Sequence, residues 1–329
     1  MADVARVAGV STQTVSRALN DSGRISVETR EHILEVVRRM GYRRNVAART
    51  LVNRRSGIIG IVVSDTDQYA PRLTMLGIES ALRMNGYGVS LHSYDHGDDD
   101  QARAALGQMA AQGVEAVVLI GGRLTEISAE ERERLGVPLV TIRGDATDDP
   151  LSIGIDQVAG ARLATNYLLD RGHDTVAHVA GPTDWLDSLL REEGWRQALI
   201  SRGRTPQPIE HRGDWTARSG YDIGKTLLPR VRQGDLTAIF VANDQMAMGM
   251  CRALLEGGLA VPADASIVGF DDLPEAGFYS PPLTTVRQDL QALSERAAEK
   301  VLTLIAETTS EAGGLIVPEL ITEGRLSAG

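Results

Sequence analysis

The chain of 329 residues has a single cysteine, Cys251, and only two lysines. One cysteine cannot form a disulfide within the chain, which is typical of a protein from a reducing compartment. No run of about 18 apolar residues occurs, so we expect no membrane span. The first residues lack the charged-then-apolar pattern of an export signal. These absences predict a cytoplasmic protein, and the length predicts two or three compact domains.

Sequence patterns of catalysis are missing as well. The chain has no G-x-x-x-x-G-K-[ST] phosphate loop, no G-x-S-x-G nucleophile turn, and no convincing acid–base pair or triad. His92 and His96 lie four residues apart at a strand end rather than on a helix, which argues against a metal site. The acidic run 95–100 could hold a cation, but a solvated turn explains it more simply. We therefore expect no enzyme, no cofactor and no metal.

The net charge of −10 is distributed unevenly along the chain. Residues 1–56 carry 11 arginines and 5 acidic side chains, a balance of +6, whereas the remainder carries 23 basic and 39 acidic side chains, a balance of −16. A basic segment before an acidic one is expected where one small domain binds a polyanion such as DNA. Because lysine is scarce everywhere, the use of arginine alone in this segment indicates nothing further.

The stretch GVSTQTVSRALND, residues 9–21, predicts a helix with two chemically different faces. Ser11 is a suitable N-cap for it. At 3.6 residues per turn, the polar face carries Thr12, Gln13, Ser16 and Arg17, and the opposite face carries Val15, Ala18 and Leu19. Such a polar face can hydrogen-bond to base edges and phosphates. A solvated helix face without a partner would show the same pattern.

Two further helices are predicted around this one. Residues 2–9 should bury Val4 and Val7 and end at Gly9, and residues 26–42 begin with Ser26 as N-cap. Two helices joined through AGVS have the spacing of a helix-turn-helix, whose second helix enters the major groove of DNA. A helical bundle that contacts another protein is the alternative, but it explains neither the polar face nor the charge.

Residues 44–56 predict a short helix with a weak core face. Asn45 can cap a helix that runs through Leu51. Alone in water a helix of fewer than about 12 residues is marginal. We expect this segment to order only against a second copy of itself and DNA, with Leu51 inserted between base pairs in the minor groove.

From Gly57 onward, apolar strand-like runs alternate with amphipathic helices. Strands are predicted at 57–64, 87–94, 115–122, 138–144, 151–156, 175–181, 209–213, 238–244, 266–272 and 284–289. Helices are predicted at 73–86, 101–113, 160–172, 190–203, 219–228 and 244–258. This alternation predicts parallel sheets with helices on both faces. The length fits two such subdomains, divided near residue 156, with the chain crossing back near residue 285.

Polar and aromatic residues follow several of the predicted strands. They are Ser64, Asp65, Arg143, Asp214, Trp215, Asn243, Asp244, Asp271 and Asp272. Ligands of open parallel sheets bind beyond the carboxyl ends of the strands. Carboxylates, amides and arginine pair with sugar hydroxyls, and a tryptophan stacks on the apolar face of the ring. The pattern predicts a polyol site, although some of these residues could instead cap the helices that follow.

The amino-terminal sequence resembles the LacI family of bacterial transcription regulators. The resemblance rests on D-V-A-x-x-A-G-V-S from Asp3, then T-V-S-R, then N-x-x-A-x-x-L from Asn45, a combination highly specific for that family. It continues through AGPTDWLDSLLREEGW, GDWTARSGY, VANDQMAMG, SIVGFDD and SPPLTTVRQDL. It implies an α/β protein with an N-terminal helix-turn-helix head and two doubly wound parallel-sheet subdomains of the periplasmic-binding-protein type.

The resemblance also implies a domain plan and a function. The plan is a DNA-binding domain at 1–43, a hinge helix and linker at 44–56, and a ligand-binding and dimerisation domain at 57–329. The implied function is a repressor that binds a pseudo-palindromic operator as a homodimer and responds to a small-molecule effector. The expected ligand is a saccharide, with a galactoside-like sugar among the candidates.

The resemblance places the functional residues on this sequence. The implied DNA contacts are Ser11, Thr12, Gln13, Thr14, Ser16, Arg17, Asn20, Arg24, Tyr42, Asn45, Ala48 and Leu51. The implied effector contacts are Ser64, Gln68, Arg143, Arg191, Trp215, Asn243, Asp271 and Gln288.

Several positions depart from the family pattern. Arg143 stands where many members have an aspartate, and Gln68 and Leu290 replace apolar and aromatic pocket residues. The exact sugar, and the choice between induction and corepression, therefore stay open. A purine-like corepressor competes with a sugar, although Trp215 and Asp271 favour the sugar.

Both ends of the sequence carry expectations too. The family usually has a threonine or serine cap before the first helix, where this chain begins Met1-Ala2-Asp3, so that helix is uncapped or the true start lies upstream. The sequence ends TEGRLSAG without a leucine-heptad tail, so we expect a dimer rather than a tetramer.

Two other classes of protein are alternatives to a regulator. A solute-binding protein would have no use for the basic head, and turnover of a bound saccharide would indicate an enzyme instead.

Overall fold

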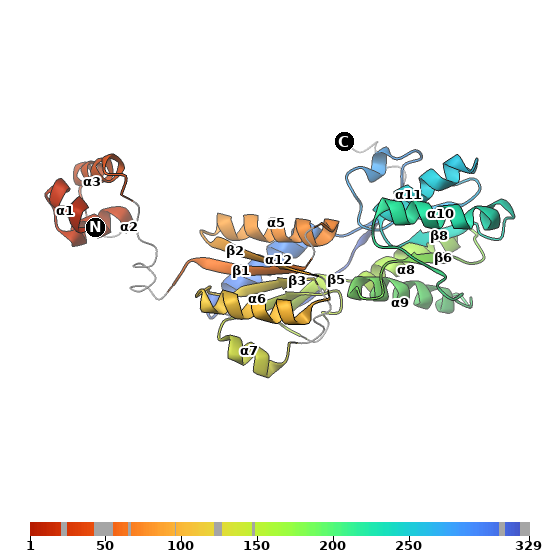
Figure 1. Cartoon of the computed structure of the whole chain (residues 1–329), viewed down its shortest axis with the longest axis horizontal. Coiled ribbons are helices and arrows are strands. Elements are labelled where there is room, and N and C mark those ends of the chain that lie inside the picture. The colour runs from red at the N-terminus through yellow and green to blue at the C-terminus, as the bar shows by residue number, and fades with distance from the viewer. Residues whose placement is uncertain are drawn as a thin grey trace. The chain divides into compact units, whose positions relative to one another are not determined.

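The computed structural model describes residues 1–20, 25–42, 55–64, 67–95, 97–121, 127–146, 149–308 and 313–322. The side chain of Asn20 also lies outside this description. The chain divides into two compact units, Met1–Ser56 and Gly57–Gly329 (Figure 1). Within the described ranges, no helix has both the length and the apolar character needed to cross a membrane.

Three helices make up the described part of the first unit: α1 (Ala2–Ala8), α2 (Thr12–Asn20) and α3 (Val27–Arg39). Their core contains Val4, Val15 and Ile33, each fully buried. Sequence expectations about the helix ends are confirmed. Helix α1 has no side-chain cap and ends at Gly9 with φ 68°, a left-handed conformation that suits glycine.

The caps of the other two helices also follow the sequence. Ser11 Oγ accepts a hydrogen bond from the Thr14 N–H at 3.0 Å, and Ser26 Oγ accepts one from the Thr29 N–H at 3.2 Å. The predicted burial of Val7 is wrong, because its side chain is 45% exposed.

A helical wheel explains the error at Val7. The buried residues of α1 are Val4, Ala5 and Ala8. Val7 lies about 100° around the helix from the centre of that face. Its side chain is therefore carried past the edge of a small core.

The first subdomain of Gly57–Gly329 contains a parallel sheet in the order β11-β5-β4-β3-β1-β2. Its strands are β1 (Ile58–Ser64), β2 (Gly88–Tyr94), β3 (Val117–Ile120), β4 (Leu139–Ile142), β5 (Ser152–Ile155) and β11 (Gly314–Ile316). Helices α5 (Tyr69–Met84) and α12 (Leu290–Ile305) pack together on one face, and α6 (Asp99–Ala111) covers the other (Figure 1). The short α7 (Ala129–Leu135) lies beside α6.

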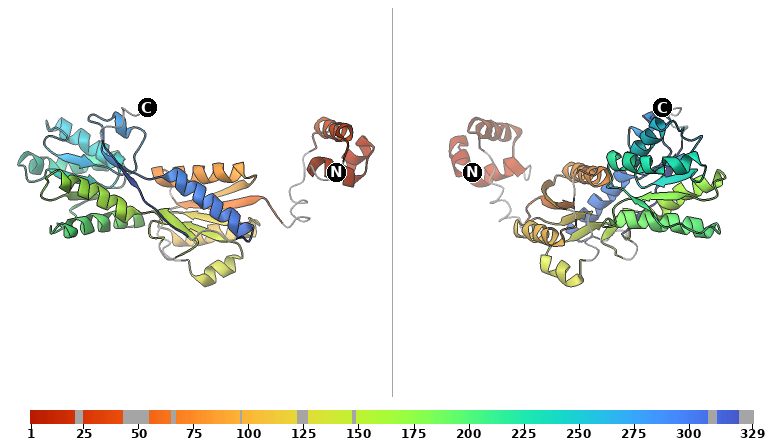
Figure 2. Two further views of the ribbon diagram at one scale, coloured as in Figure 1. Left: turned by 180° about the vertical axis from the view of Figure 1, so that it is seen from behind. Right: turned by 45° about the vertical axis from the view of Figure 1, so that its right-hand side comes forward.

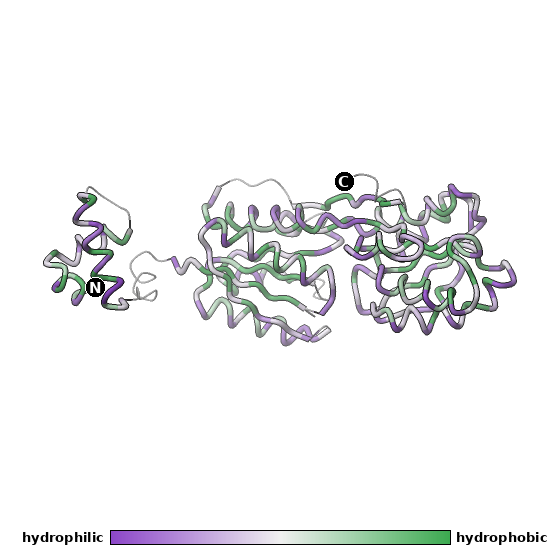
Figure 3. The backbone as a smooth tube through the Cα atoms, turned by 90° about the horizontal axis from the view of Figure 1, so that it is seen from above, coloured by the Kyte–Doolittle hydropathy of each residue, from purple (hydrophilic) through white to green (hydrophobic). Residues whose placement is uncertain are grey.

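Alternation along β1 explains why both faces of this sheet are covered. Ile59, Ile61 and Val63 belong to the core with α5 and α12, whereas Val62 belongs to the core with α6. Successive strand residues point to opposite faces, so an apolar run such as IIGIVV must be buried on both sides. Figure 3 shows the corresponding hydrophobic stretches along the strands and hydrophilic stretches along the helices.

The second subdomain contains a parallel sheet in the order β7-β6-β8-β9. Its strands are β6 (Ala177–Ala180), β7 (His211–Arg212), β8 (Ala238–Val241) and β9 (Ser266–Val268). Helices α8 (Gln157–Asp170) and α9 (Leu186–Ser201) cover one face, and α10 (Ala217–Arg232) and α11 (Asp244–Glu256) cover the other (Figure 2). All ten strands predicted from the sequence are present in the two sheets or in β10 (Thr285–Arg287).

The described chain passes between the subdomains three times. The first two passages follow β5 and β10, close to the predicted positions near residues 156 and 285. The third joins β11 to β12 (Glu319–Ile321), which pairs antiparallel with β10. A short 3-10 helix, η1 (Ala276–Phe278), precedes β10. The third passage was not expected from the sequence.

Candidate functional site

Helix α2 presents the polar face that its sequence predicts. Thr12, Gln13 and Arg17 are exposed, whereas Val15 and Ala18 are buried. The first unit thus leaves amide, hydroxyl and guanidinium groups accessible on one side of a helix. These are the donors and acceptors that read base edges in a major groove.

The remaining DNA-contact candidates have different surroundings. Ser11 and Thr14 place their hydroxyl oxygens 2.8 Å apart in the cap of α2. Ser16 is half-buried, and Tyr42 packs against the helical core while its N–H donates to the Val37 carbonyl at 3.1 Å. The other candidates, namely the Asn20 side chain, Arg24, Asn45, Ala48 and Leu51, lie outside the described residues.

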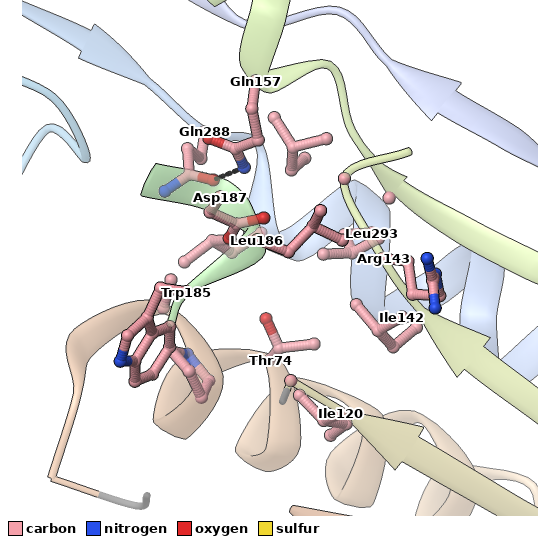
Figure 4. A pocket seen from close by; sticks show the side chains of 17 residues that line it. Thr74, Ile120, Ile142, Arg143, Gln157, Trp185, Leu186, Asp187, Gln288 and Leu293 are labelled. Carbon is pink, nitrogen blue, oxygen red and sulfur yellow. Dashed lines mark hydrogen bonds between the residues drawn. The ribbon is translucent and has the colours of Figure 1, made fainter. Parts of the chain in front are cut away.

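A cavity of about 60 Å³ lies between the two subdomains of Gly57–Gly329 (Figure 4). The first subdomain and α12 contribute Ala70, Pro71, Thr74, Ile120, Gly121, Ile142, Arg143, Gly144, Gly154, Ile155, Leu290 and Leu293. The second subdomain and the crossing segments contribute Gln157, Trp185, Leu186, Asp187 and Gln288. The carboxyl ends of β3, β4 and β5 reach this cavity, as expected for a parallel sheet.

A closed hydrogen-bond network stands at the wall formed by the second subdomain. Arg191, 3% exposed, donates from Nε to Gln157 Oε1 at 2.9 Å and from Nη1 to the Ala242 carbonyl at 2.6 Å. Its Nη2 lies 3.5 Å from Asp271 Oδ1. Gln288 Nε2 donates to Asp271 at 2.7 Å, and Gln157 Nε2 donates to Gln288 Oε1 at 2.9 Å. The buried guanidinium is therefore held from three sides.

The buried position of Asp271 beside Arg191 changes the pKa of its carboxylate. Burial raises the pKa of Asp271 to about 6, while Arg191 and the Gln288 hydrogen bond act in the opposite direction. The backbone of Asp271 has φ 109°, outside the range that non-glycine residues usually adopt. Strained conformations of this kind cluster at functional sites.

Trp215 combines a strained backbone with close packing. Its φ is 74°, and its ring lies against Gly181, where an added Cβ would approach the ring to 2.3 Å. Its Nε1 is buried and has no hydrogen-bond partner among the described residues. The ring of Trp185, which lines the cavity, meets the Trp215 ring edge-on with centroids 5.8 Å apart.

Asn243 bears out the capping alternative. Its Oδ1 accepts from the Met246 N–H at 2.9 Å at the start of α11, and its Nδ2 donates to the Trp215 carbonyl at 3.0 Å. The side chain therefore holds the loop that carries Trp215 while it caps a helix. This role is structural as it stands.

The candidates of the first subdomain lie at strand and helix ends. Ser64 ends β1, and its buried Oγ has no partner among the described residues. Gln68 precedes α5 without a side-chain capping bond. Arg143 follows β4, lines the cavity, and donates to Asp145 from Nε at 2.8 Å and from Nη2 at 2.6 Å. Among the predicted effector contacts, Arg143 and Gln288 thus line the cavity directly.

Several lining residues were missed by sequence reasoning. Gln157 lies two residues beyond the end of β5, and Trp185 and Asp187 lie in the loop and first turn after β6, so the strand-end rule could have found all three. Thr74 lies within α5 and gives no such signal. In the described part of the chain, no group of three or more His, Cys, Asp or Glu side chains converges to hold a metal ion.

Comparison with known proteins agrees with this architecture. Residues 1–45 match the family model "Bacterial regulatory proteins, lacI family", and residues 165–324 match the "Periplasmic binding protein-like domain". The chain is 34% identical over 305 residues to the lactose operon repressor of Escherichia coli (strain K12), which covers 92% of this chain and 83% of that protein.

Solved structures give the same result. The lac repressor dimer bound to operator and an anti-inducer is similar with a TM-score of 0.87 and 31% identity, covering 97% of this chain and 96% of that chain. The CelR–cellobiose complex is similar with a TM-score of 0.69 and 29% identity, covering 97% of both chains.

A helix-turn-helix unit followed by a two-subdomain ligand-binding body defines a class of DNA-binding regulators. The chain belongs to the LacI family of bacterial regulatory proteins.

Proposed function

We propose that this protein is a sequence-specific transcriptional repressor of the bacterial cytoplasm whose affinity for operator DNA is controlled by a saccharide. One observation supports this most strongly: the cavity between the subdomains combines polar side chains of the second subdomain and the crossing segments, namely Gln157, Asp187 and Gln288, with an apolar wall. A sugar ring has the same division, with hydroxyls at its edge and C–H groups on its faces.

DNA binding in this proposal belongs to the first unit. Two copies place their α2 helices in successive major grooves, where Thr12, Gln13 and Arg17 contact base edges. A bidentate arginine–guanine pair discriminates against a wrong base by about 1–3 kcal/mol. The lac repressor structure, a dimer bound to operator, supports a dimer here. Ser11, Ser16 and Asn20 complete this contact surface.

The hinge segment 44–56 completes the DNA-binding part of the proposal on sequence grounds. Asn45 and Ala48 contact the DNA backbone, and Leu51 from each copy enters the minor groove and kinks the central step. Effector binding separates the two hinges. Because their short helices depend on each other, separation melts them.

Effector binding in this proposal occurs in the cavity of the second unit. Arg191, Asp271 and Gln288 anchor hydroxyls, Trp185 and Trp215 cover an apolar face, and Arg143 approaches from the other subdomain. The complex of the related CelR with cellobiose supports the saccharide class. The ligand changes the angle between the subdomains, and a differential binding energy of about 1–3 kcal/mol between the two arrangements is enough for control. The bound saccharide leaves unchanged, since the proposed role is regulation and not turnover.

The first step is to select the genomic DNA fragments that the full-length protein binds. Arg17→Ala is expected to weaken binding to the selected sequence at least about tenfold and to affect random duplex much less, because base readout is lost while phosphate contacts remain. The control is Arg218→Ala, an exposed arginine of α10 that is 80% accessible. Equal losses on selected and random DNA would remove α2 from sequence readout.

The ligand part is tested by adding mono- and disaccharides to the protein–operator complex. At least one saccharide should change operator affinity and leave the cavity unreacted, as judged by chromatography of the recovered sugar. Conversion of the sugar to a product would indicate an enzyme instead.

A further inference from the structure

One carboxylate on the cavity wall has no hydrogen-bond or ion-pair partner among the described residues. Asp187 lies in the first turn of α9 and lines the cavity among the side chains shown in Figure 4. No hydrogen bond or ion pair joins its carboxylate to any described residue. Burial raises its pKa, the nearby Arg191 lowers it, and the carboxylate of Asp145 raises it further. When ionised, a carboxylate in this position is stabilised by a ligand that donates hydrogen bonds to it.

The two arginines near Asp187 are already engaged elsewhere. Arg143 makes two hydrogen bonds to Asp145 in bidentate geometry. Arg191 is held by Gln157, by a backbone carbonyl and by Asp271. Each guanidinium thus has a carboxylate of its own, and Arg191 acts on Asp187 only through its charge, without a hydrogen bond or ion pair.

Because Gly144 has no side chain, it leaves room for Asp187 at the boundary between the two subdomains. A Cβ at Gly144 would lie 2.8 Å from Asp187 Oδ1 and 2.9 Å from Leu190 Cδ1. Gly144 follows β4 in the first subdomain, whereas Asp187 belongs to α9 in the second. The carboxylate therefore faces the end of β4 at a distance that a larger residue at position 144 would prevent. A ligand in the cavity therefore meets Asp187 beside Gly144, where the two subdomains are in close contact.

We propose that Asp187 determines effector specificity by accepting hydrogen bonds from hydroxyls of an uncharged saccharide and by excluding anionic relatives such as uronates and sugar phosphates. This inference rests on the proposed saccharide function and deepens it. A carboxylate accepts but does not donate, so it selects ligand groups that donate. A ligand carboxylate or phosphate brings only acceptors and a like charge to Asp187, which lines the cavity. Asp187 is half-buried, so water screens this repulsion only in part.

The experiment uses matched pairs of sugars that differ in charge: D-glucose with D-glucuronate, and D-galactose with D-galacturonate. Calorimetric titration of the full-length protein should give binding of at least one neutral member, with its acid partner at least about tenfold weaker. Asp187→Asn, which keeps the shape and removes the charge, should weaken the neutral sugar at least about tenfold and reduce the neutral-to-acid preference to below about threefold.

The control is Asp222→Asn on α10, where the carboxylate is 54% exposed and pairs with Arg218. It should leave both affinities unchanged. The inference is overturned if the native protein binds an acid as tightly as its neutral partner, a result that needs no variant and no assumption about folding. It is also overturned if Asp187→Asn, folded as judged by its thermal transition, keeps both the affinity and the preference.

The role of Asp187 and the proposed saccharide function can be disproved separately. A saccharide that changes operator affinity without any dependence on Asp187 would overturn this inference and leave the proposed function intact. If no sugar of any pair binds or alters operator affinity, the saccharide class itself is wrong, and the role of Asp187 falls with it.

Discussion

The two walls of the cavity are built in different ways. On the side of the second subdomain, Gln157 and Gln288 line the cavity and join Arg191 and Asp271 in a ring of hydrogen bonds between 2.7 and 3.5 Å long. On the side of the first subdomain the wall is mainly apolar, with Ile120, Ile142, Leu290 and Leu293. Hydrogen bonds fix direction, whereas apolar contacts do not.

This difference assigns separate tasks to the two walls. A network with every group satisfied holds a fixed geometry, so it can present a rigid template to ligand hydroxyls. An apolar surface can move over a ligand without leaving a polar group unpaired. We therefore expect the second subdomain to select the ligand and the first subdomain to change position when the ligand is bound.

The largest effect is expected from replacing Arg191 in the hydrogen-bond ring. Arg191→Ala leaves Asp271 buried without its cation, so we expect the free energy of unfolding to fall by about 3–5 kcal/mol and effector binding to be lost. Chemical denaturation and ligand titration measure the two effects. Arg196→Ala on the same helix removes an exposed ion pair with Glu193 and should change neither. A variant at position 191 with native stability would contradict the idea that the network holds this wall.

His178 can be compared with the network residues, because it is a buried polar group of the second subdomain that lies outside the network. It is 5% exposed, stacks on Phe240, and has an Nε2 without a partner among the described residues, while Nδ1 lies 3.0 Å from the Phe240 carbonyl. Burial lowers its pKa from 6.5 to about 3.

The sign of the resulting pH effect follows from linkage. The folded protein holds His178 neutral, so its contribution to stability is complete above pH 6.5 and is lost as the pH falls from there toward 3. Between pH 7 and pH 5 this loss amounts to about 2 kcal/mol. His178→Leu should reduce the pH 7 to pH 5 difference in unfolding free energy by that amount. An unchanged difference would mean that His178 accepts a proton without cost.

Gly144 tests how closely the two walls approach each other. Gly144→Ala places a Cβ within 3 Å of Asp187 and Leu190, and we expect a loss of about 1–2 kcal/mol in unfolding free energy together with weaker effector binding. Gly107→Ala on α6 meets no atom within 4 Å and should instead stabilise by about 0.5–1 kcal/mol. Effects of the same sign at both positions would contradict the close approach.

Arg143 should show the smallest effect on folding. Its ion pair with Asp145 is partly exposed, with 18% and 36% of the two side chains accessible. Arg143→Ala is therefore expected to change the unfolding free energy by less than about 1 kcal/mol, although ligand preference should change. A loss as large as that of Arg191→Ala would show that both walls depend equally on buried charge.

Much of the fold could be predicted from the sequence because its signals are local. Fully apolar strands such as IIGIVV, caps such as Ser11 and Ser26, and the glycine that ends α1 each follow from short-range rules. The split of α2 into a polar and an apolar face follows in the same way. Family resemblance then supplied the order of the domains.

The parts that could not be predicted depend on contacts distant in sequence. The third passage between subdomains requires GLI at 314–316 to find β5, more than 150 residues earlier. The ring around Arg191 joins residues from four separate segments, and no local sequence pattern predicts it. The strand-end rule could have placed Asp187 near the cavity, but its lack of a partner among the described residues is visible only from the side-chain positions.

The most direct test of the account is the affinity of the full-length protein for a selected genomic sequence and for random duplex, at about 0.15 M salt, with and without a bound saccharide. We predict a preference of at least about a thousandfold for the selected sequence, and a change of at least about tenfold in that preference when the saccharide occupies the cavity. Equal affinity for both duplexes, unaffected by any sugar that binds, would contradict it.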